Sequence, residues 1–137
     1  MFKKLFVCAF ALLLILSFNF NSKSPLFASY NDKFEVYVGK SASISHAQLV
    51  GEKEFPLING VIGESCEINS ACSYEKVFED FSAELIFIEE TEDGVSYYGF
   101  SPKIKYREEV NGRKVNLHVH VERGRMKVGS PIIYGSF

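Results

Sequence analysis

The chain has 137 residues, a formal net charge of −2 at neutral pH, and a composition that is 47% hydrophobic and 15% aromatic. Its length is enough for one ordinary domain and excludes two. All seven tyrosines and seven of the thirteen phenylalanines lie in residues 29–137, which provides ample aromatic volume for one compact core.

The first 28 residues have the layout of a secretory signal peptide. Lys3 and Lys4 precede an apolar run over residues 5–16, and Ala28 provides a small residue at a cleavage position. The apolar run is shorter than the roughly 20 residues of a membrane-spanning helix, so we expect no stable transmembrane span after cleavage. We predict a signal peptide over residues 1–28, a single domain over residues 29–137, and a secreted or extracytoplasmic location. The alternative is membrane anchoring by an uncleaved N-terminal segment.

Charge is unevenly distributed along the predicted mature chain. Residues 29–100 contain 4 basic and 14 acidic residues, whereas residues 101–137 contain 8 basic and 3 acidic residues. Such asymmetry indicates either a charged partner or two halves that pack together and neutralise one another.

Short strands are predicted in the first part of the domain. Residues 34–38 and 65–68 alternate between polar and apolar side chains, and residues 44–50 form a further candidate strand. Asn59-Gly60 lies between the apolar runs 55–58 and 61–62, which predicts a compact hairpin. Pro56 lacks a backbone N–H and therefore favours a sheet edge for its strand.

One amphipathic helix is predicted over residues 73–82. Its apolar residues fall at positions i, i+3, i+4 and i+7 and form one stripe, consisting of Tyr74, Val77, Phe78 and Phe81. Ser73 or Ser70 can cap its N-terminus. A helix this short needs a sheet to cover its stripe.

Two hairpins follow the helix. The first joins residues 83–90 to 95–100; a two-residue turn at Asp93-Gly94 would set Phe87 opposite Phe100. The second closes on Asn111-Gly112 and pairs residues 103–110 with 113–120. We therefore predict an α+β fold: an antiparallel sheet of about five strands with the short helix packed on one face.

The second hairpin is predicted to expose a basic face. Its register points the apolar side chains of both strands into the core and the cations out to solvent. The predicted partner-binding residues are Lys103, Lys105, Arg107, Lys114, His118 and His120. Such a face suits an anionic envelope polymer, a lipid head group or an acidic protein surface, whereas export argues against nucleic acid. The alternative is an ordinary solvated face.

Cys66 and Cys72 are the two cysteines of the predicted mature chain. An exported chain permits a disulfide between them, and two buried free thiols are the alternative. The two cysteines with His118 and His120 are ligand types that zinc prefers, but their spacing matches no zinc signature. The predicted register also sets Lys105 and Lys103 opposite the histidines, and their positive charges oppose the binding of a metal ion there. We predict no metal and no cofactor.

Cys72, just before a predicted helix, precedes His118 by 46 residues. This order resembles the layout of papain-like cell-wall peptidases, although their aspartate before the cysteine is Ala71 here and their glycine two residues after it is Tyr74. The resemblance implies a cysteine hydrolase that uses Cys72 and His118, which is the alternative function. The primary prediction is an exported, non-enzymatic binding or interaction module, since no other catalytic motif is present. A structural secreted protein is the remaining alternative.

Overall fold

The structure, a computed structural model, describes residues 3–4, 7–9, 24–39, 46–68 and 72–134. Residues 3–4 and 7–9 are helical. The strands, in chain order, are β1 (Lys33–Val38), β2 (His46–Gly51), β3 (Val61–Ile68), β4 (Glu84–Thr91), β5 (Gly94–Phe100), β6 (Glu108–Val110), β7 (Arg113–Val115), β8 (Leu117–Glu122) and β9 (Arg125–Ser130). A 3-10 helix, η2 (Phe55–Leu57), and an α-helix, α2 (Tyr74–Asp80), complete the described elements.

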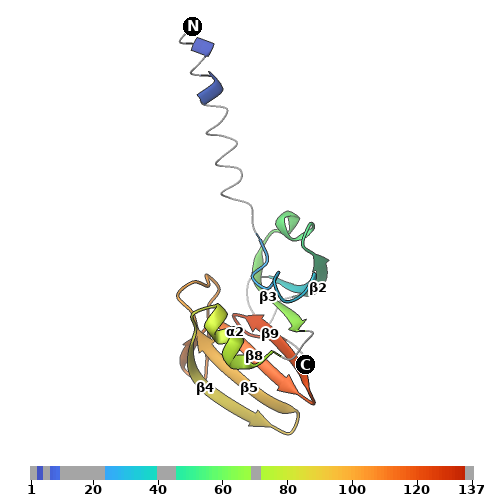
Figure 1. The fold of residues 1–137 in the computed structure, drawn as a ribbon, viewed down its shortest axis with the longest axis vertical. Helices are drawn as coiled ribbons and strands as arrows, with labels where there is room; N and C mark the ends of the chain where they lie inside the picture. Colours follow the sequence, from blue (N-terminus) through green and yellow to red (C-terminus); the bar gives the residue numbers. More distant parts are fainter. Residues whose placement is uncertain (1–2, 5–6, 10–23, 40–45, 69–71, 135–137) are drawn as a thin grey trace.

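Seven strands form one antiparallel sheet in the order β2-β1-β3-β9-β8-β5-β4 (Figure 1). Strand β9 joins the two halves of this sheet, because it pairs with β3 from the first half of the chain and with β8 from the second. Strands β6 and β7 form a separate two-stranded hairpin. The strands β8 and β9 of the basic part of the sequence therefore lie between β3 and β5 of the acidic part.

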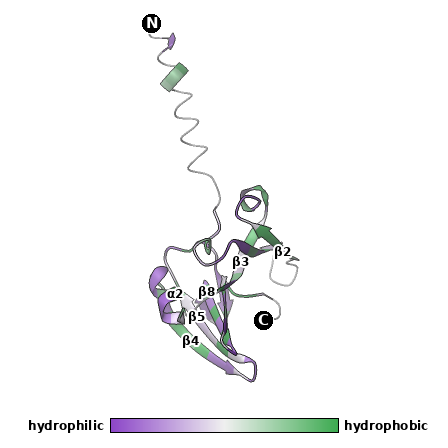
Figure 2. Cartoon of the chain, turned by 45° about the vertical axis from the view of Figure 1, so that its right-hand side comes forward, coloured by the Kyte–Doolittle hydropathy of each residue, from purple (hydrophilic) through white to green (hydrophobic). Residues whose placement is uncertain are grey.

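Helix α2 begins after Ser73, whose side chain accepts a hydrogen bond from the Lys76 N–H at 3.3 Å. Four of its seven residues are charged, so it appears largely purple in Figure 2. Val77 and Phe78 are buried against the sheet. The Phe78 ring lies directly on Gly99 of β5, where an added Cβ would come within 2.7 Å of it. A glycine at this position therefore lets the helix approach the sheet closely.

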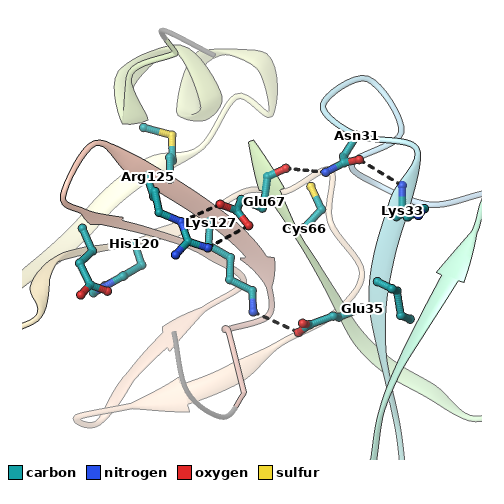
Figure 3. Close-up of a pocket in the computed structure, with 11 residues that line it drawn as sticks. Asn31, Lys33, Glu35, Cys66, Glu67, His120, Arg125 and Lys127 are labelled. Atoms are coloured by element: carbon teal, nitrogen blue, oxygen red, sulfur yellow. Dashed lines mark hydrogen bonds and ion pairs between the residues drawn. The ribbon is translucent and has the colours of Figure 1, made fainter. Parts of the chain in front are cut away.

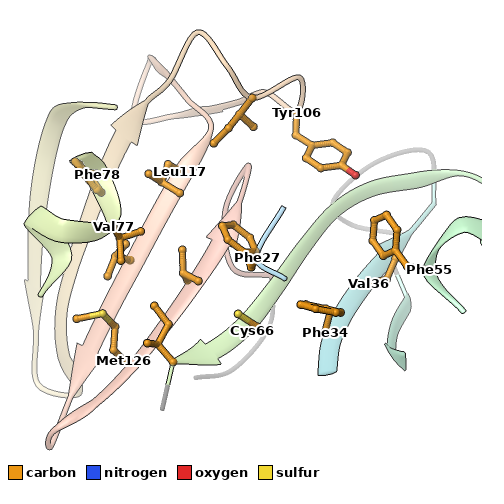
Figure 4. Packing of buried hydrophobic residues seen from close by; sticks show 14 of the residues in the cluster. Phe27, Phe34, Val36, Phe55, Cys66, Val77, Phe78, Tyr106, Leu117 and Met126 are labelled. Atoms are coloured by element: carbon orange, nitrogen blue, oxygen red, sulfur yellow. The ribbon is translucent and has the colours of Figure 1, made fainter. Parts of the chain in front are cut away.

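The two faces of the sheet are covered differently. The helix face carries α2 and the main apolar core, shown in Figure 4, which includes Phe27, Phe34, Val36, Cys66, Val77, Phe78, Leu117, Val119, Met126 and Val128. The histidine face carries the alternate residues of the same strands, including Ser65, Ser96, Tyr98, His118, His120 and Gly129. Residues 131–134 fold back over this second face, where Ile133 packs on Gly129 and Tyr134 lies edge-on to Tyr37.

The predicted fold class is confirmed in its main features: a mostly antiparallel sheet with one short helix. The sheet has seven strands rather than about five. Hairpin reasoning finds only neighbours in the chain, whereas the β3–β9 and β5–β8 pairs join distant segments. The hairpin predicted at Asn59-Gly60 is wrong, because residues 55–57 form η2 and β3 starts at Val61.

The register predicted for the two later hairpins is only partly right. Near Asn111-Gly112 the pairs Glu109–Lys114 and Val110–Arg113 are confirmed. Farther from the turn the prediction is wrong, since residues 101–107 form no strand and β8 pairs with β5 and β9 instead. In the first hairpin the turn is at Glu92-Asp93, so that Phe87 lies opposite Tyr98 and not Phe100.

Candidate functional site

Residues 101–107 form a basic segment between β5 and β6, which begins with a turn in which the Ile104 N–H donates to the Ser101 carbonyl at 3.4 Å. Ile104 and Tyr106 point inward and are 0% and 9% exposed, while Lys103, Lys105 and Arg107 are exposed. This alternation gives the segment the side-chain pattern of a strand although it pairs with no neighbour. We refer to Lys103, Lys105 and Arg107 as the basic segment.

Buried hydrogen bonds fix the backbone of this segment. The Asn116 side chain accepts from the Ser101 N–H at 2.6 Å and donates to the carbonyls of Ser101 and Ile104 at 2.7 and 3.2 Å. Tyr106 donates its hydroxyl to the buried Glu64 carboxylate at 3.2 Å. Neither Asn116 nor Glu64 was predicted as part of the site from the sequence; a polar residue within a strong strand pattern is the signal that points to Asn116. The three cations are therefore presented by a rigid backbone.

Two of the three cations of the basic segment contact aromatic rings. Lys105 Nζ lies 5.2 Å from the centre of the Tyr106 ring, and Arg107 Cζ lies 4.9 Å from the centre of the Phe100 ring. Among the described residues, the four ion pairs involve Lys76, Arg125, Lys127 and His120 and no cation of the basic segment. Lys114, also exposed, lies on β7 opposite Glu109. The positive charge of the basic segment is thus available to a partner.

His118 and His120 do not belong to this surface, and their predicted exposure is wrong. They are 1% and 3% exposed, because β8 lies between β5 and β9 and residues 131–134 fold over this face of the sheet. The His118 ring stacks on Tyr98 at 4.2 Å, and Tyr98 stacks in turn on Phe87 at 4.5 Å. The predicted basic face is therefore reduced to its lysines and arginine.

Ser96 connects the two histidines by hydrogen bonds. Its Oγ lies 2.9 Å from His118 Nε2 and 2.8 Å from His120 Nδ1. Because the Ile133 N–H donates to His118 Nδ1 at 3.1 Å, the neutral His118 ring carries its proton on Nε2 and donates it to Ser96. We therefore assign the Ser96 hydroxyl proton to His120 Nδ1. Along the chain Ile133–His118–Ser96–His120, each group then donates a hydrogen bond to the next.

Burial holds both imidazoles in the neutral form. Burial, together with a smaller effect of the nearby His120, lowers the pKa of His118 to about 3. Burial also lowers the pKa of His120, against the opposing charges of Glu122 and Asp93. Ser96 is itself buried, so this chain has the properties of a structural network within the sheet.

A groove of about 370 Å³ opens on the histidine face (Figure 3). Its charged lining is mostly paired. Arg125 donates two hydrogen bonds to Glu67 at 2.9 and 3.2 Å, and Lys127 contacts Glu35 at 3.0 Å. Both pairs join the basic half of the sequence to the acidic half, so charge neutralisation between the halves takes place here. Two of its three lysine and arginine side chains, Arg125 and Lys127, are paired, so the groove is the weaker site for an anion.

Cys66 and Cys72 are free thiols in the structure, so the predicted disulfide is not formed in it. Burial raises the pKa of Cys66 to about 12, which makes it an unreactive thiol. Cys72 packs against the core of the helix face, whereas His118 lies on the opposite face of the sheet. The structure thus separates the two residues of the predicted cysteine hydrolase.

No group of three or more potential metal ligands occurs in the described parts of the chain. Within the same residues, no helix has the length and apolarity to cross a membrane. Comparison with protein families, with curated proteins and with solved structures finds no match for this chain.

Proposed function

We propose that this protein is an exported, non-enzymatic binding module that holds an anionic polymer of the cell envelope on its basic segment. The observation that carries the proposal is that Lys103, Lys105 and Arg107 form no ion pair with the described residues and lie on a backbone fixed by Asn116 and Glu64. Cations already neutralised within a protein contribute little to a partner, whereas unpaired cations attract one over several ångströms.

The spacing of the basic segment favours a polymer over a single small anion. The three cations alternate with the buried Ile104 and Tyr106, so their side chains share the solvent side of the segment and form a row of positive charge. A chain of repeating phosphates can meet several of these cations at once, and each added contact increases the affinity. Lipid head groups and acidic protein surfaces are the other partners that the same charge could attract.

The test is binding of a polyglycerol phosphate chain at increasing salt concentration. We expect affinity to fall steeply with salt, and we expect the triple variant K103E, K105E and R107E to bind about tenfold more weakly or worse. Vesicles containing phosphatidylglycerol, measured in parallel, distinguish a lipid surface from the polymer.

A matched control changes three exposed cations elsewhere: K33E, K53E and R123E. It alters the net charge by the same amount as the triple variant but leaves the basic segment intact. Equal loss of binding in both variants would show that only net charge matters. Unchanged binding by the basic-segment variant would reject the proposed site.

A further inference from the structure

The segment before β1 is part of the apolar core. Pro25 and Phe27 are buried, and Phe27 is 0% exposed. Its ring lies edge-on to Phe81 at 5.5 Å, and Figure 4 shows it among core side chains from both halves of the sheet. Phe27 lies on the leader side of the cleavage predicted after Ala28.

Glu64 fixes the backbone of the same segment. This carboxylate on β3 is 0% exposed and accepts the Leu26 N–H as well as the Tyr106 hydroxyl. A buried carboxylate is tolerated only when donors satisfy it. Leu26, which also lies before the predicted cleavage, provides one of its donors.

Tyr30 and Asn31, which follow the predicted cleavage position, form further contacts. The Tyr30 N–H donates to the Phe27 carbonyl at 2.9 Å, and the Tyr30 hydroxyl donates to Asp80 of α2 at 2.6 Å. The Asn31 side chain donates to the Glu67 carbonyl at 2.9 Å. Cleavage after Ala28 would keep the last two contacts, but it would remove Phe27 from the core and Leu26 from Glu64.

We infer that the mature protein retains Leu26 and Phe27, so that signal peptidase does not cut after Ala28. Removal of a whole buried phenylalanine leaves a cavity that the surrounding core cannot fill, and the same cut takes a donor from a buried carboxylate. The leader therefore ends before Leu26, or the apolar N-terminal segment stays attached. This inference is independent of the proposed function, since the basic segment takes no part in it.

The direct test is the N-terminus of the full chain produced in a host that exports it. Intact mass and N-terminal sequencing of the folded protein should show a start at Leu26 or earlier, including an uncleaved start at Met1. A folded protein that starts at Phe27 or later would overturn the inference.

A second measurement does not depend on export. In the full chain, F27A should lower the unfolding temperature by about 15 °C, since it empties a fully buried site. The control L57A removes a side chain that is 79% exposed and should leave that temperature nearly unchanged. Equal unfolding temperatures for F27A and L57A would show that the domain does not need Phe27 and would overturn the inference.

Discussion

The helix face and the histidine face bury the two sides of the same strands by different means. On the helix face, apolar side chains from α2 and from the segment around Phe27 fill the space above the sheet. On the histidine face, residues 131–134 cover stacked rings and a chain of hydrogen bonds through Ser96. Each face has a glycine that allows close approach, at Gly99 for Phe78 and at Gly129 for Ile133.

This difference separates two contributions to the fold. Apolar burial is favourable in almost any arrangement that excludes water, whereas a buried polar chain is favourable only in the arrangement that satisfies every member. We therefore expect the helix face to contribute most of the stability. We expect the histidine face to fix the position of β8 between β5 and β9.

The largest expected effect comes from F78A on the helix face. Removing this buried ring should lower the free energy of unfolding by about 3 to 5 kcal/mol, because a cavity remains between α2 and Gly99. Urea denaturation measures the change. The control L85A removes an apolar side chain at the sheet edge that is 38% exposed, and it should cost less than about 1 kcal/mol. Equal costs would show that α2 is not seated on the sheet as described.

Local patterns predicted the elements that local interactions determine. The apolar stripe and the Ser73 cap identified α2, and Asn111-Gly112 identified the β6–β7 turn with its first pairs. The pairing of β8 could not be predicted in this way, because its partners are set by contacts far apart in sequence. The alternation of polar and apolar residues at 103–107 is compatible with a strand and equally with a loop whose alternate residues are anchored in the core.

The candidate site, too, was predicted only where local sequence patterns determine which side chains are exposed. The lysines and the arginine of the basic segment are exposed as expected, since charged side chains are rarely buried without a partner. His118 and His120 alternate with Val119 and Leu117, which is compatible with a solvated face or with a strand covered on both sides. Only the residues that cover the histidine face, such as Ile133, decide between the two, and they lie at the far end of the chain.

A smaller effect is expected for S96A on the histidine face. The substitution removes the hydroxyl that lies between the two imidazoles and should lower the free energy of unfolding by about 1 to 3 kcal/mol, since buried polar atoms lose a partner. The control S29A changes an exposed serine and should have little effect. A cost equal to that of F78A would contradict the proposed division between the two faces, as would no cost at all.

The two faces also carry titratable groups with opposite pH dependence. On the helix face, burial raises the pKa of Glu64 to about 7, so its contribution to stability is complete below about pH 4.5 and is lost as pH rises towards 7. On the histidine face, the pKa of His118 is lowered to about 3, so its contribution is complete above about pH 6.5 and is lost as pH falls towards 3. Between about pH 4.5 and 6.5 the two dependences oppose one another.

The variant E64Q separates these dependences, because it removes the titration of Glu64 and leaves that of His118. The free energy of unfolding of E64Q minus that of the unmodified protein should rise with pH between about 4.5 and 7, by at most about 1.4 kcal/mol per pH unit. The contributions of titrating groups that the substitution leaves unchanged cancel in this difference. The control E52Q removes an exposed carboxylate and leaves Glu64 in place, and it should not reproduce that rise. A flat difference for E64Q as well would show that Glu64 titrates normally, and hence that the segment at Leu26 does not bury it.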